Sequence, residues 1–180
     1  EAVVHMTCLG VVRGALTEDI KRVKGAGLQN ILALRGDPPI DDLSFTVEGD
    51  ACRYAIDLIK VIKSDYPEAC VLGACYPEGH QDAANRELDL QRLKEKCDAG
   101  LDVLVTQLFF DNAHYFDFVN RVRKVGVTQP ILPGIMPVTN LAQVERFTKM
   151  CGATIPHPLL ERLQQSRDEQ EVLAVGVEHA

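Results

Sequence analysis

The hydrophobic positions of this chain fall into five short runs that are rich in branched aliphatic residues. Each run is followed by a longer segment whose apolar residues recur at helical spacing. The runs show little polar alternation, which is typical of strands buried on both faces of a parallel sheet. Their starts lie about 27 to 40 residues apart, a spacing that fits successive β-α units. The pattern predicts strands at Val3–Cys8, Asn30–Leu34, Cys70–Cys75, Val103–Phe109 and Ile131–Met136.

The segments between these strands carry helix start and stop signals. Thr17, followed by two acidic residues, predicts an N-cap, and Gly25 and Gly27 predict the end of that helix. Asp111 and Asn140 predict the N-caps of two later helices, the second with the third-position glutamine of a capping box. Further helices are predicted within Gly49–Ser64, within Gln81–Ala99, and from Pro156 to Ala180 with a break near Ser166–Asp168.

Alternation of buried strands with helices leaves two architectures, a doubly wound sheet and a (β/α)₈ barrel. A doubly wound nucleotide-binding fold usually has a glycine-rich first turn, and neither G-x-G-x-x-G nor a Walker A pattern occurs. This absence favours the barrel, although such barrels have eight strands in about 250 residues. The sequence therefore predicts the α/β class: a (β/α)₈ TIM barrel, incomplete at both termini, with residues 1–180 in one domain. An open α/β sheet stays the alternative.

Composition excludes several functional classes. The 180 residues are 46% hydrophobic and carry 19 Lys and Arg against 26 Asp and Glu, a net charge of −7. This balance is typical of a globular domain and argues against both disorder and general nucleic-acid binding. No apolar stretch approaches the roughly 18 residues of a membrane helix, and no secretory signal is visible.

Cysteine usage indicates a reducing compartment. The six cysteines form no C-x-x-C pair, so the usual zinc and thioredoxin-like spacings are absent. A chain of this length with a full apolar core does not need disulfides. We therefore expect six thiols and a cytoplasmic protein.

Polar residues that follow the predicted strands are the candidate functional groups, because ligands of both architectures bind at the carboxyl ends of the strands. Each of these residues also has an interpretation in which it serves the fold and binds no ligand. Asp37 is also a good turn residue, His5 could be a satisfied core histidine, and His80 could be a plain surface residue. An amide within a strand must be paired, so Gln107 bonds backbone, another side chain or a ligand. No set of residues has metal-ligand spacing, and no catalytic triad is suggested.

Six short motifs follow one another along the chain. They are His5–Cys8 (H-x-T-C), Ala33–Asp37 (A-L-R-G-D), Tyr54–Leu58 (Y-A-x-D-L), Tyr76–His80 (Y-P-x-x-H), Thr106–Phe110 (T-Q-x-F-F) and Pro133–Pro137 (P-G-I-x-P). In this order they resemble the motifs of methylenetetrahydrofolate reductases. Because the motifs are spread over most of the chain, the resemblance is specific.

The resemblance implies a flavoprotein with a (β/α)₈ barrel. Such enzymes reduce 5,10-methylenetetrahydrofolate to 5-methyltetrahydrofolate, with electrons that pass from NAD(P)H through FAD. The implied cofactor is FAD, the implied small-molecule partners are the folate and the nicotinamide cofactor, and the complete protein is expected to be a homo-oligomer. Neither a metal, a nucleic acid nor a membrane is implied.

The resemblance also assigns roles to individual residues. It places ten residues against FAD: His5, Arg35, Gly36, Asp37, Tyr54, Ala55, Tyr76, His80, Asp89 and Lys96. It places four residues against the folate: Asp37, Gln107, Gln143 and Phe147. Asp37 is the implied catalytic residue, since a carboxylate there opposes negative charge on the reduced flavin and favours a cationic iminium form of the folate. Gln143 and Phe147 also have capping and core interpretations.

Some expected features of the family have no counterpart in this sequence. The resemblance places the general acid, a glutamate on the first barrel strand, before residue 1. It places a closing strand and a folate-binding arginine after residue 180. Two alternatives follow: a pterin-binding or folate-binding barrel of the methyltransferase type without flavin chemistry, and a non-catalytic α/β fragment.

Overall fold

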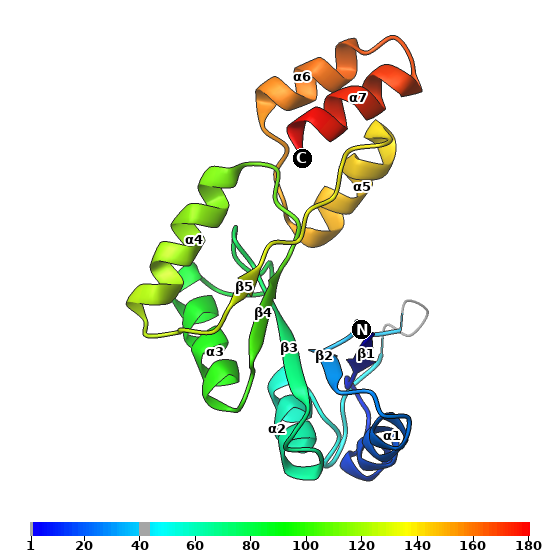
Figure 1. The fold of residues 1–180 in the computed structure, drawn as a ribbon, viewed down its shortest axis with the longest axis vertical. Helices are drawn as coiled ribbons and strands as arrows, with labels where there is room; N and C mark the ends of the chain where they lie inside the picture. The colour runs from blue at the N-terminus through cyan, green and yellow to red at the C-terminus, as the bar shows by residue number, and fades with distance from the viewer. Residues whose placement is uncertain (1, 40–43) are drawn as a thin grey trace. The chain divides into compact units, whose positions relative to one another are not determined.

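The computed structural model describes residues 2–39 and 44–180, and in this part of the chain five strands alternate with helices (Figure 1). The elements are β1 (Val3–Thr7), α1 (Arg13–Gly25), β2 (Asn30–Leu34), α2 (Ala55–Asp65), β3 (Cys70–Cys75), α3 (Arg86–Asp98), β4 (Val103–Thr106), α4 (Asn112–Lys124), β5 (Ile131–Leu132), α5 (Leu141–Cys151), α6 (His157–Gln165) and α7 (Glu169–His179).

The strands follow one another in the sheet in chain order, β1-β2-β3-β4-β5. β1 pairs with β2 in parallel, with Val3 opposite Asn30 and Thr7 opposite Leu34, and β2 pairs with β3 in the same sense. Consecutive parallel strands joined by helices are the β-α-β arrangement that the hydrophobic runs predict. The predicted α/β class is therefore confirmed.

The chain divides into two compact units. Unit 1 comprises residues 1–74, 91–105 and 127–130, and unit 2 comprises residues 75–90, 106–126 and 131–180. The prediction of one domain over residues 1–180 stays a prediction.

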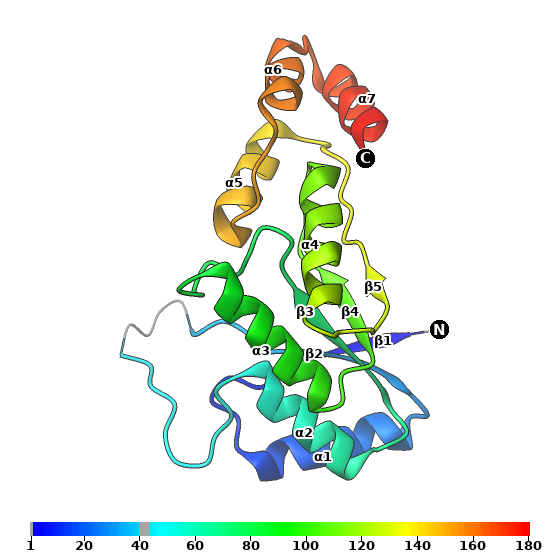
Figure 2. The same cartoon turned by 90° about the vertical axis from the view of Figure 1, so that its left-hand side faces the viewer.

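Unit 1 is built on helices packed against one face of its strands. α1 and α2 lie side by side (Figure 2), and α2 contacts β2. Burial alternates along β2, where Ile31 and Ala33 are buried, and only β3 has a run of consecutive buried residues. The prediction that every strand is buried on both faces is therefore wrong, because in the described residues helices cover mainly one face. The largest buried residues of unit 1 are Leu16, Ile20, Ile31, Leu58, Ile59, Ile62, Val71, Leu101 and Leu104.

The first helix begins earlier than its sequence signal indicates. α1 starts at Arg13 after Val12, so Thr17 lies within the helix and is not its N-cap. The Thr17 hydroxyl donates instead to Asp65 Oδ2 at 2.6 Å, which ties α1 to the end of α2. The predicted end at Gly25 is confirmed.

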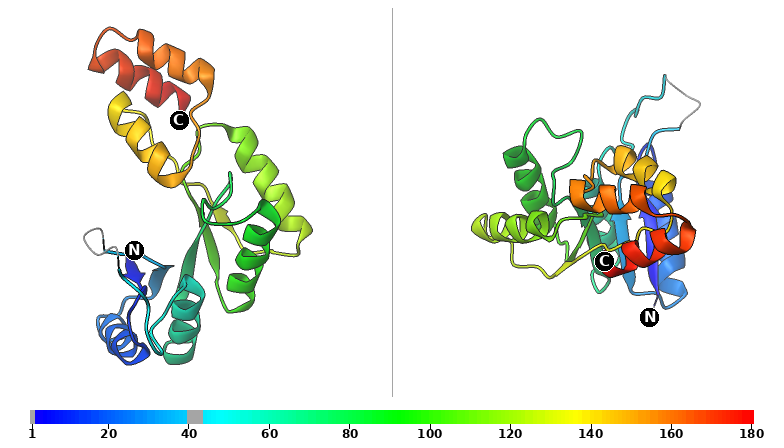
Figure 3. Two further views of the ribbon diagram at one scale, coloured as in Figure 1. Left: turned by 180° about the vertical axis from the view of Figure 1, so that it is seen from behind. Right: turned by 90° about the horizontal axis from the view of Figure 1, so that it is seen from above.

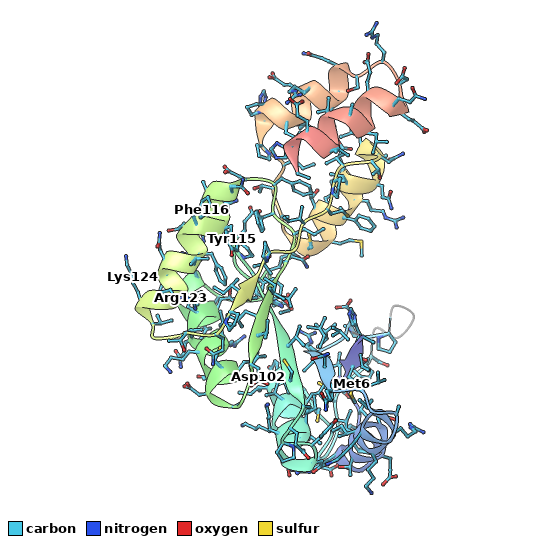
Figure 4. The ribbon with its side chains drawn as sticks, viewed as in Figure 1. Met6, Asp102, Tyr115, Phe116, Arg123 and Lys124 are labelled. Carbon is cyan, nitrogen blue, oxygen red and sulfur yellow. The ribbon has the colours of Figure 1, made fainter. Side chains whose placement is uncertain are left out.

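A polar cluster fixes the amino-terminal ends of the strands in unit 1. Asp102, which is labelled in Figure 4, directly precedes β4. Its Oδ2 accepts hydrogen bonds from Lys63 Nζ at 2.7 Å and from Val71 N at 2.8 Å. The cluster lies at the end of the strands opposite the candidate residues, the end at which polar groups of β-α folds serve stability.

Unit 2 has its own core, formed by α5, α6, α7 and the segment before α5. Its buried members are Phe110, Val138, Val144, Ala153, Leu159 and Leu163. α6 and α7 form a helical pair next to the C-terminus (Figure 3), and the predicted break between them is confirmed. The predicted N-caps also hold: Asp111 Oδ1 accepts from Ala113 N at 2.8 Å, and Asn140 Oδ1 accepts from Gln143 N at 2.9 Å.

We expect the close packing of β3 to make Gly73 sensitive to a single added methyl group. A Cβ at Gly73 would lie 2.1 Å from Leu101 Cδ1, and both residues are buried. Gly73→Ala should therefore lower the free energy of unfolding by about 1–3 kcal/mol. Gly14→Ala is the matched control, since nothing lies within 4 Å of its Cβ position on α1. There the same change should stabilise the helix by about 0.5–1 kcal/mol.

Urea denaturation of both variants and the parent protein measures these differences. Equal stabilities for the Gly73 variant and the parent would contradict the packing at β3.

Candidate functional site

The loop after β2 carries Arg35, Gly36 and Asp37 and is fixed against the end of β1. The Arg35 carbonyl oxygen accepts a hydrogen bond from Cys8 N at 3.2 Å. Gly36 has a φ of +81°, which L side chains rarely adopt, and a Cβ there would lie 3.0 Å from Thr7 Cβ. The Asp37 side chain, directly after this constrained glycine, is exposed. The backbone therefore holds Asp37 at the carboxyl end of the strand with its carboxylate open to solvent.

His5 lies on β1, opposite Leu32 of β2, and is exposed. Its neighbour Met6 is buried, as the alternation of a strand requires (Figure 4 labels Met6). The interpretation of His5 as a core histidine is therefore wrong. Its imidazole is open to solvent on the strand face opposite the buried Met6.

Tyr54 stands immediately before α2 with its side chain 55% exposed. Asp57 Oδ2 accepts hydrogen bonds from Arg53 N at 2.9 Å and Tyr54 N at 3.0 Å, so the first turn of α2 is satisfied by its own carboxylate. Cys8 Sγ donates to the Tyr54 carbonyl oxygen at 3.4 Å. These bonds hold the Tyr54 backbone and leave its ring exposed, next to the half-buried Ala55.

Lys96 is the last candidate of unit 1. It is half-buried on α3, and its Nζ donates to the Ala74 carbonyl oxygen at 2.7 Å. Ala74 is the penultimate residue of β3. The ammonium group is therefore fixed at the carboxyl end of that strand.

In unit 2, the loop after β3 brings together three residues that the resemblance assigns to FAD. The rings of Tyr76 and His80 pack edge to face, with centroids 4.5 Å apart and an interplanar angle of 75°. Asp89 Oδ2 accepts from His80 N at 3.3 Å, and Asp82 N donates to His80 Nδ1 at 3.0 Å. Because Nδ1 accepts a hydrogen bond, Nε2 carries the proton of the neutral ring and is a donor.

A pocket of about 280 Å³ opens beside His80. It combines an imidazole with the Arg86 guanidinium, two groups that bind anions. Sequence reasoning missed Arg86, which belongs to none of the six motifs. The only signal was a cation at the start of a helix whose first turn is otherwise acidic. The lining residues are Glu78, Gly79, His80, Gln81, Ala83, Asn85, Arg86 and Gly152.

Glu78 is a second residue whose role sequence reasoning did not identify. Its side chain is 11% exposed, and its carboxylate accepts hydrogen bonds from Thr154 N at 3.0 Å and from Thr154 Oγ1 at 2.6 Å. His114 Nδ1 lies 3.4 Å from Glu78 Oε2. Glu78 thus ties the loop after β3 to the segment after α5 and to α4. The sign of this role in the sequence is the position of its carboxylate, between the tyrosine and the histidine of the Tyr76–His80 motif.

Gln107 directly follows β4, which ends at Thr106 and not at Phe109 as predicted. Gln107 N donates to the Cys75 carbonyl oxygen at 2.7 Å, and Gln107 Oε1 accepts from Leu108 N at 2.9 Å. The side-chain oxygen is therefore paired with the local backbone, the first of the three alternatives.

The loop after β5 approaches β4 closely through a glycine. Gly134 N donates to Thr106 Oγ1 at 2.8 Å, which satisfies the buried threonine hydroxyl. A Cβ at Gly134 would lie 2.4 Å from the Thr106 carbonyl oxygen. This contact gives the glycine of the P-G-I-x-P motif and the threonine of the T-Q-x-F-F motif a structural role.

Gln143 and Phe147 lie four residues apart on α5 and therefore share a helix face. Gln143 is exposed, and its backbone N–H is capped by Asn140. Phe147 is half-buried, with Arg146 Cζ 5.8 Å from its ring centroid. Part of the ring packs against unit 2, and the rest of its surface is exposed to solvent.

Three of the six cysteines, Cys8, Cys52 and Cys70, have raised pKa values that make them poor nucleophiles at neutral pH. All six are free thiols, as predicted. Burial, with a smaller contribution from nearby Cys52 and Asp57, raises the pKa of Cys8 to about 12. Burial also raises the pKa of Cys52 and Cys70. A thiol with a raised pKa stays protonated and is a poor nucleophile.

None of the predicted site residues lines a second pocket of unit 2. A larger pocket of unit 2, about 420 Å³, is lined by residues of α4, α6, α7 and the loops beside them, such as Phe109, Met136 and His179. Among the residues described, no cluster of His, Cys, Asp and Glu could hold a metal ion. None of the helices in residues 2–39 and 44–180 is both long and apolar enough to cross a membrane.

Known proteins give the same family along the whole sequence. The family model of methylenetetrahydrofolate reductase matches residues 1–180. Methylenetetrahydrofolate reductase 2 of Saccharomyces cerevisiae is 39% identical over 176 residues, which are 96% of this chain and 29% of the yeast protein. Methylenetetrahydrofolate reductase (NADH) 1 of Zea mays is 39% identical over 185 residues, which are 96% of this chain and 31% of the maize protein. The chain thus spans about 30% of the length of these relatives.

A solved structure shares the fold at low sequence identity. An uncharacterized Clostridium thermocellum protein that binds two copies of 5-methyl-5,6,7,8-tetrahydrofolic acid aligns with a TM-score of 0.55 and 13% identity. The alignment covers 98% of this chain and 80% of that protein. At this identity the likeness concerns the fold alone, whereas the family model matches the sequence itself from end to end. The chain belongs to the methylenetetrahydrofolate reductase family.

Proposed function

We propose that this chain contributes cofactor-binding and folate-binding residues to an FAD-dependent reductase, which converts 5,10-methylenetetrahydrofolate to 5-methyltetrahydrofolate with electrons from a nicotinamide cofactor. Membership of the family over residues 1–180 is the observation that carries the proposal. All six motifs lie within the matched sequence, and each contributes residues at the carboxyl end of a strand or the start of the following helix.

The donor chemistry of the two units fits the parts of FAD. In unit 2, the pocket beside His80 offers the Nε2 donor and the Arg86 guanidinium, which suit the oxygens of a diphosphate. In unit 1, Arg35 and Lys96 add two cations at strand ends, and the exposed Tyr54 ring offers an aromatic surface. When bound, FAD would supply hydride transfer between the nicotinamide and the folate.

We assign the ten residues of the sequence-based set to the cofactor in this proposal. In unit 1 they are His5, Arg35, Gly36, Asp37, Tyr54, Ala55 and Lys96, and in unit 2 they are Tyr76, His80 and Asp89. Asp89 acts through the backbone of His80, to which it is hydrogen bonded, and Gly36 provides the close approach of the chain that a larger residue would block.

Asp37 is the proposed catalytic residue. Its carboxylate is exposed, and the left-handed Gly36 and the bond at the Arg35 carbonyl oxygen constrain the backbone that leads to it. A fixed negative charge favours positive charge that develops nearby and disfavours added negative charge. Asp37 would therefore stabilise a cationic iminium form of the folate substrate, the form that accepts hydride.

Gln107, Gln143 and Phe147 are the proposed folate contacts of unit 2. The Gln107 amide can donate a hydrogen bond to the pterin through Nε2, whereas its Oε1 already accepts one from Leu108 N. The partly exposed Phe147 ring offers a face to the aminobenzoate group, and Gln143 lies on the same side of α5.

We expect the purified full-length protein to show flavin absorption bands that co-elute with it after FAD is added. His80→Ala should raise the FAD dissociation constant about tenfold, because one hydrogen bond to a charged group is lost. His157→Ala is the matched control, since the His157 side chain is 80% exposed on α6. Titration of flavin fluorescence measures both variants.

A folded protein that takes up no FAD would overturn the proposed function. Folate binding without flavin bands would instead favour the methyltransferase-type alternative. Equal FAD affinity in the two histidine variants would remove His80 from the site.

We expect Asp37→Asn to lower kcat for the reduction of methylenetetrahydrofolate about 100-fold, because the neutral amide no longer stabilises positive charge on the folate. The FAD dissociation constant should change by much less. Asp50→Asn, another exposed aspartate in a loop, serves as the control and should keep the parent kcat. Formation of 5-methyltetrahydrofolate gives the rate, and a kcat within twofold of the parent would exclude the catalytic role.

A further inference from the structure

The loop after β3, residues 76–85, is held on unit 2 at its start and at its middle. Arg121 of α4 donates to the Pro77 carbonyl oxygen at 3.1 Å, which fixes the start of the loop. Glu78 then binds both donors of Thr154, at 3.0 Å and 2.6 Å. Gln81 Nε2 donates to the Lys149 carbonyl oxygen at 3.4 Å.

The Glu78–Thr154 contact lies at the surface, where Thr154 is exposed, and it differs from a single surface hydrogen bond in its geometry. Glu78 is 11% exposed, and its two oxygens take the backbone N–H and the hydroxyl of the same threonine. His114 Nδ1 lies 3.4 Å from the same carboxylate. Hydrogen bonds to a carboxylate are shorter and stronger than those between neutral groups, and two of them to one residue also fix its orientation.

The partner segment of the loop is itself rigidly placed. α5 ends at Cys151 and is closed by Gly152 in the left-handed conformation, with a φ of +74°. The Gln81 side chain occupies the space beside this glycine, since a Cβ there would lie 2.6 Å from Gln81 Nε2. The next residue, Ala153, is buried in the core of unit 2. Thr154 is therefore anchored by the core and can hold the loop in one position.

Glu78 and His80 are two residues apart on this loop, and both line the pocket of about 280 Å³. A loop that is free to move would leave the His80 imidazole and the Arg86 guanidinium in many relative positions. Fixing one end of the loop reduces that freedom before a ligand arrives, so less binding energy is spent on ordering.

We propose that Glu78 and Thr154 form a positioning clamp that sets His80 in the anion-binding geometry of this pocket. Glu78 is a positioning residue and not an anion contact, because a carboxylate has no donor to offer a diphosphate, and its two oxygens accept hydrogen bonds from Thr154. The proposal rests on the proposed function, since the diphosphate of FAD is the anion it concerns. It goes further by assigning Glu78 and Thr154, which lie outside the ten cofactor residues, to the preorganisation of that site.

The test measures FAD affinity of the full-length protein by flavin fluorescence. Thr154→Val keeps the shape of the side chain and removes the hydroxyl donor to Glu78, so the FAD dissociation constant should rise about five- to tenfold. Thr154→Ser restores the hydroxyl and should return the constant to within twofold of the parent. Thr148→Val is the matched control, because the Thr148 hydroxyl donates within α5, to the Glu145 carbonyl oxygen, and bonds to nothing else in the described part of the chain.

A double-mutant cycle with His80→Ala separates positioning from general destabilisation. If the clamp acts through His80, Thr154→Val should weaken FAD binding less than twofold further in the His80→Ala background. Full additivity of the two changes would overturn the proposal, as would equal affinities of the Thr154→Val and Thr148→Val proteins. Glu78→Gln is the second variant if Thr154→Val does not fold, with the same expected rise and the same cycle.

The outcomes also distinguish this inference from the function on which it rests. A parent protein that binds no FAD overturns both. A parent protein that binds FAD and is insensitive to both Thr154→Val and Glu78→Gln overturns only the clamp.

Discussion

Close backbone contact between neighbouring strand ends is the constraint on which the candidate loops depend. In unit 1, the Cβ position of Gly36 is filled by Thr7, and in unit 2 that of Gly134 is filled by the Thr106 carbonyl. Each glycine thus lets one loop lie directly on the threonine that ends the preceding strand of its pair. A larger residue would push the loop away and displace Asp37 or the segment after β5.

The candidate regions combine cationic side chains with carboxylates that are engaged in hydrogen bonds. The chain has a net charge of −7, and several of its carboxylates lie close to the candidate groups. Three of those carboxylates are engaged by hydrogen-bond donors: Asp57 by the start of α2, Asp89 by the backbone of His80, and Glu78 by the distant Thr154. A carboxylate that accepts backbone hydrogen bonds organises a loop, whereas a free one would compete with an incoming phosphate. Of these carboxylates, Asp89 and Glu78 organise the loop that lines the pocket beside His80.

Strand positions were predictable because branched aliphatic runs report burial, and β2 and β3 match their runs residue for residue. The ends of β4 and β5 were predicted too late, because Leu108, Phe109 and Ile135 are apolar residues of loops. Apolarity reports burial and not backbone pairing, so it cannot mark where a strand stops. Similarly, Thr17 is a residue type that often caps helices, yet α1 begins four residues before it. The Thr17 hydroxyl bonds instead to Asp65 at the end of α2. Such a long-range partner leaves no local signal.

The candidate site residues also fall into two groups, those that sequence position predicts and those that only the folded structure reveals. Position after a strand identified the Arg35–Asp37 loop and the Tyr76–His80 loop, because the end of a parallel strand can be inferred from sequence. The roles of Arg86 and Glu78 depend on the pocket beside His80 and on Thr154, 76 residues further along the chain, and these appear only in the folded chain. His5 shows the reverse error, since an apolar neighbourhood suggested the core and strand alternation exposes the ring.

These contacts also separate two kinds of residue within each motif. Thr7, Gly36, Thr106 and Gly134 are explained by packing and backbone approach, with no ligand needed. His5, Asp37 and the ring of Tyr54 are exposed, and among the residues that the structure describes no contact accounts for their side chains. A residue that the fold does not require is a better functional candidate than one that it does, because folding alone places no demand on its chemistry. In the Tyr76–His80 motif the two rings contact each other and His80 accepts a hydrogen bond from Asp82 N, so this criterion does not single them out. The proline carbonyl and the glutamate of this motif serve to hold the loop, which is why a motif match alone overstates the number of ligand contacts.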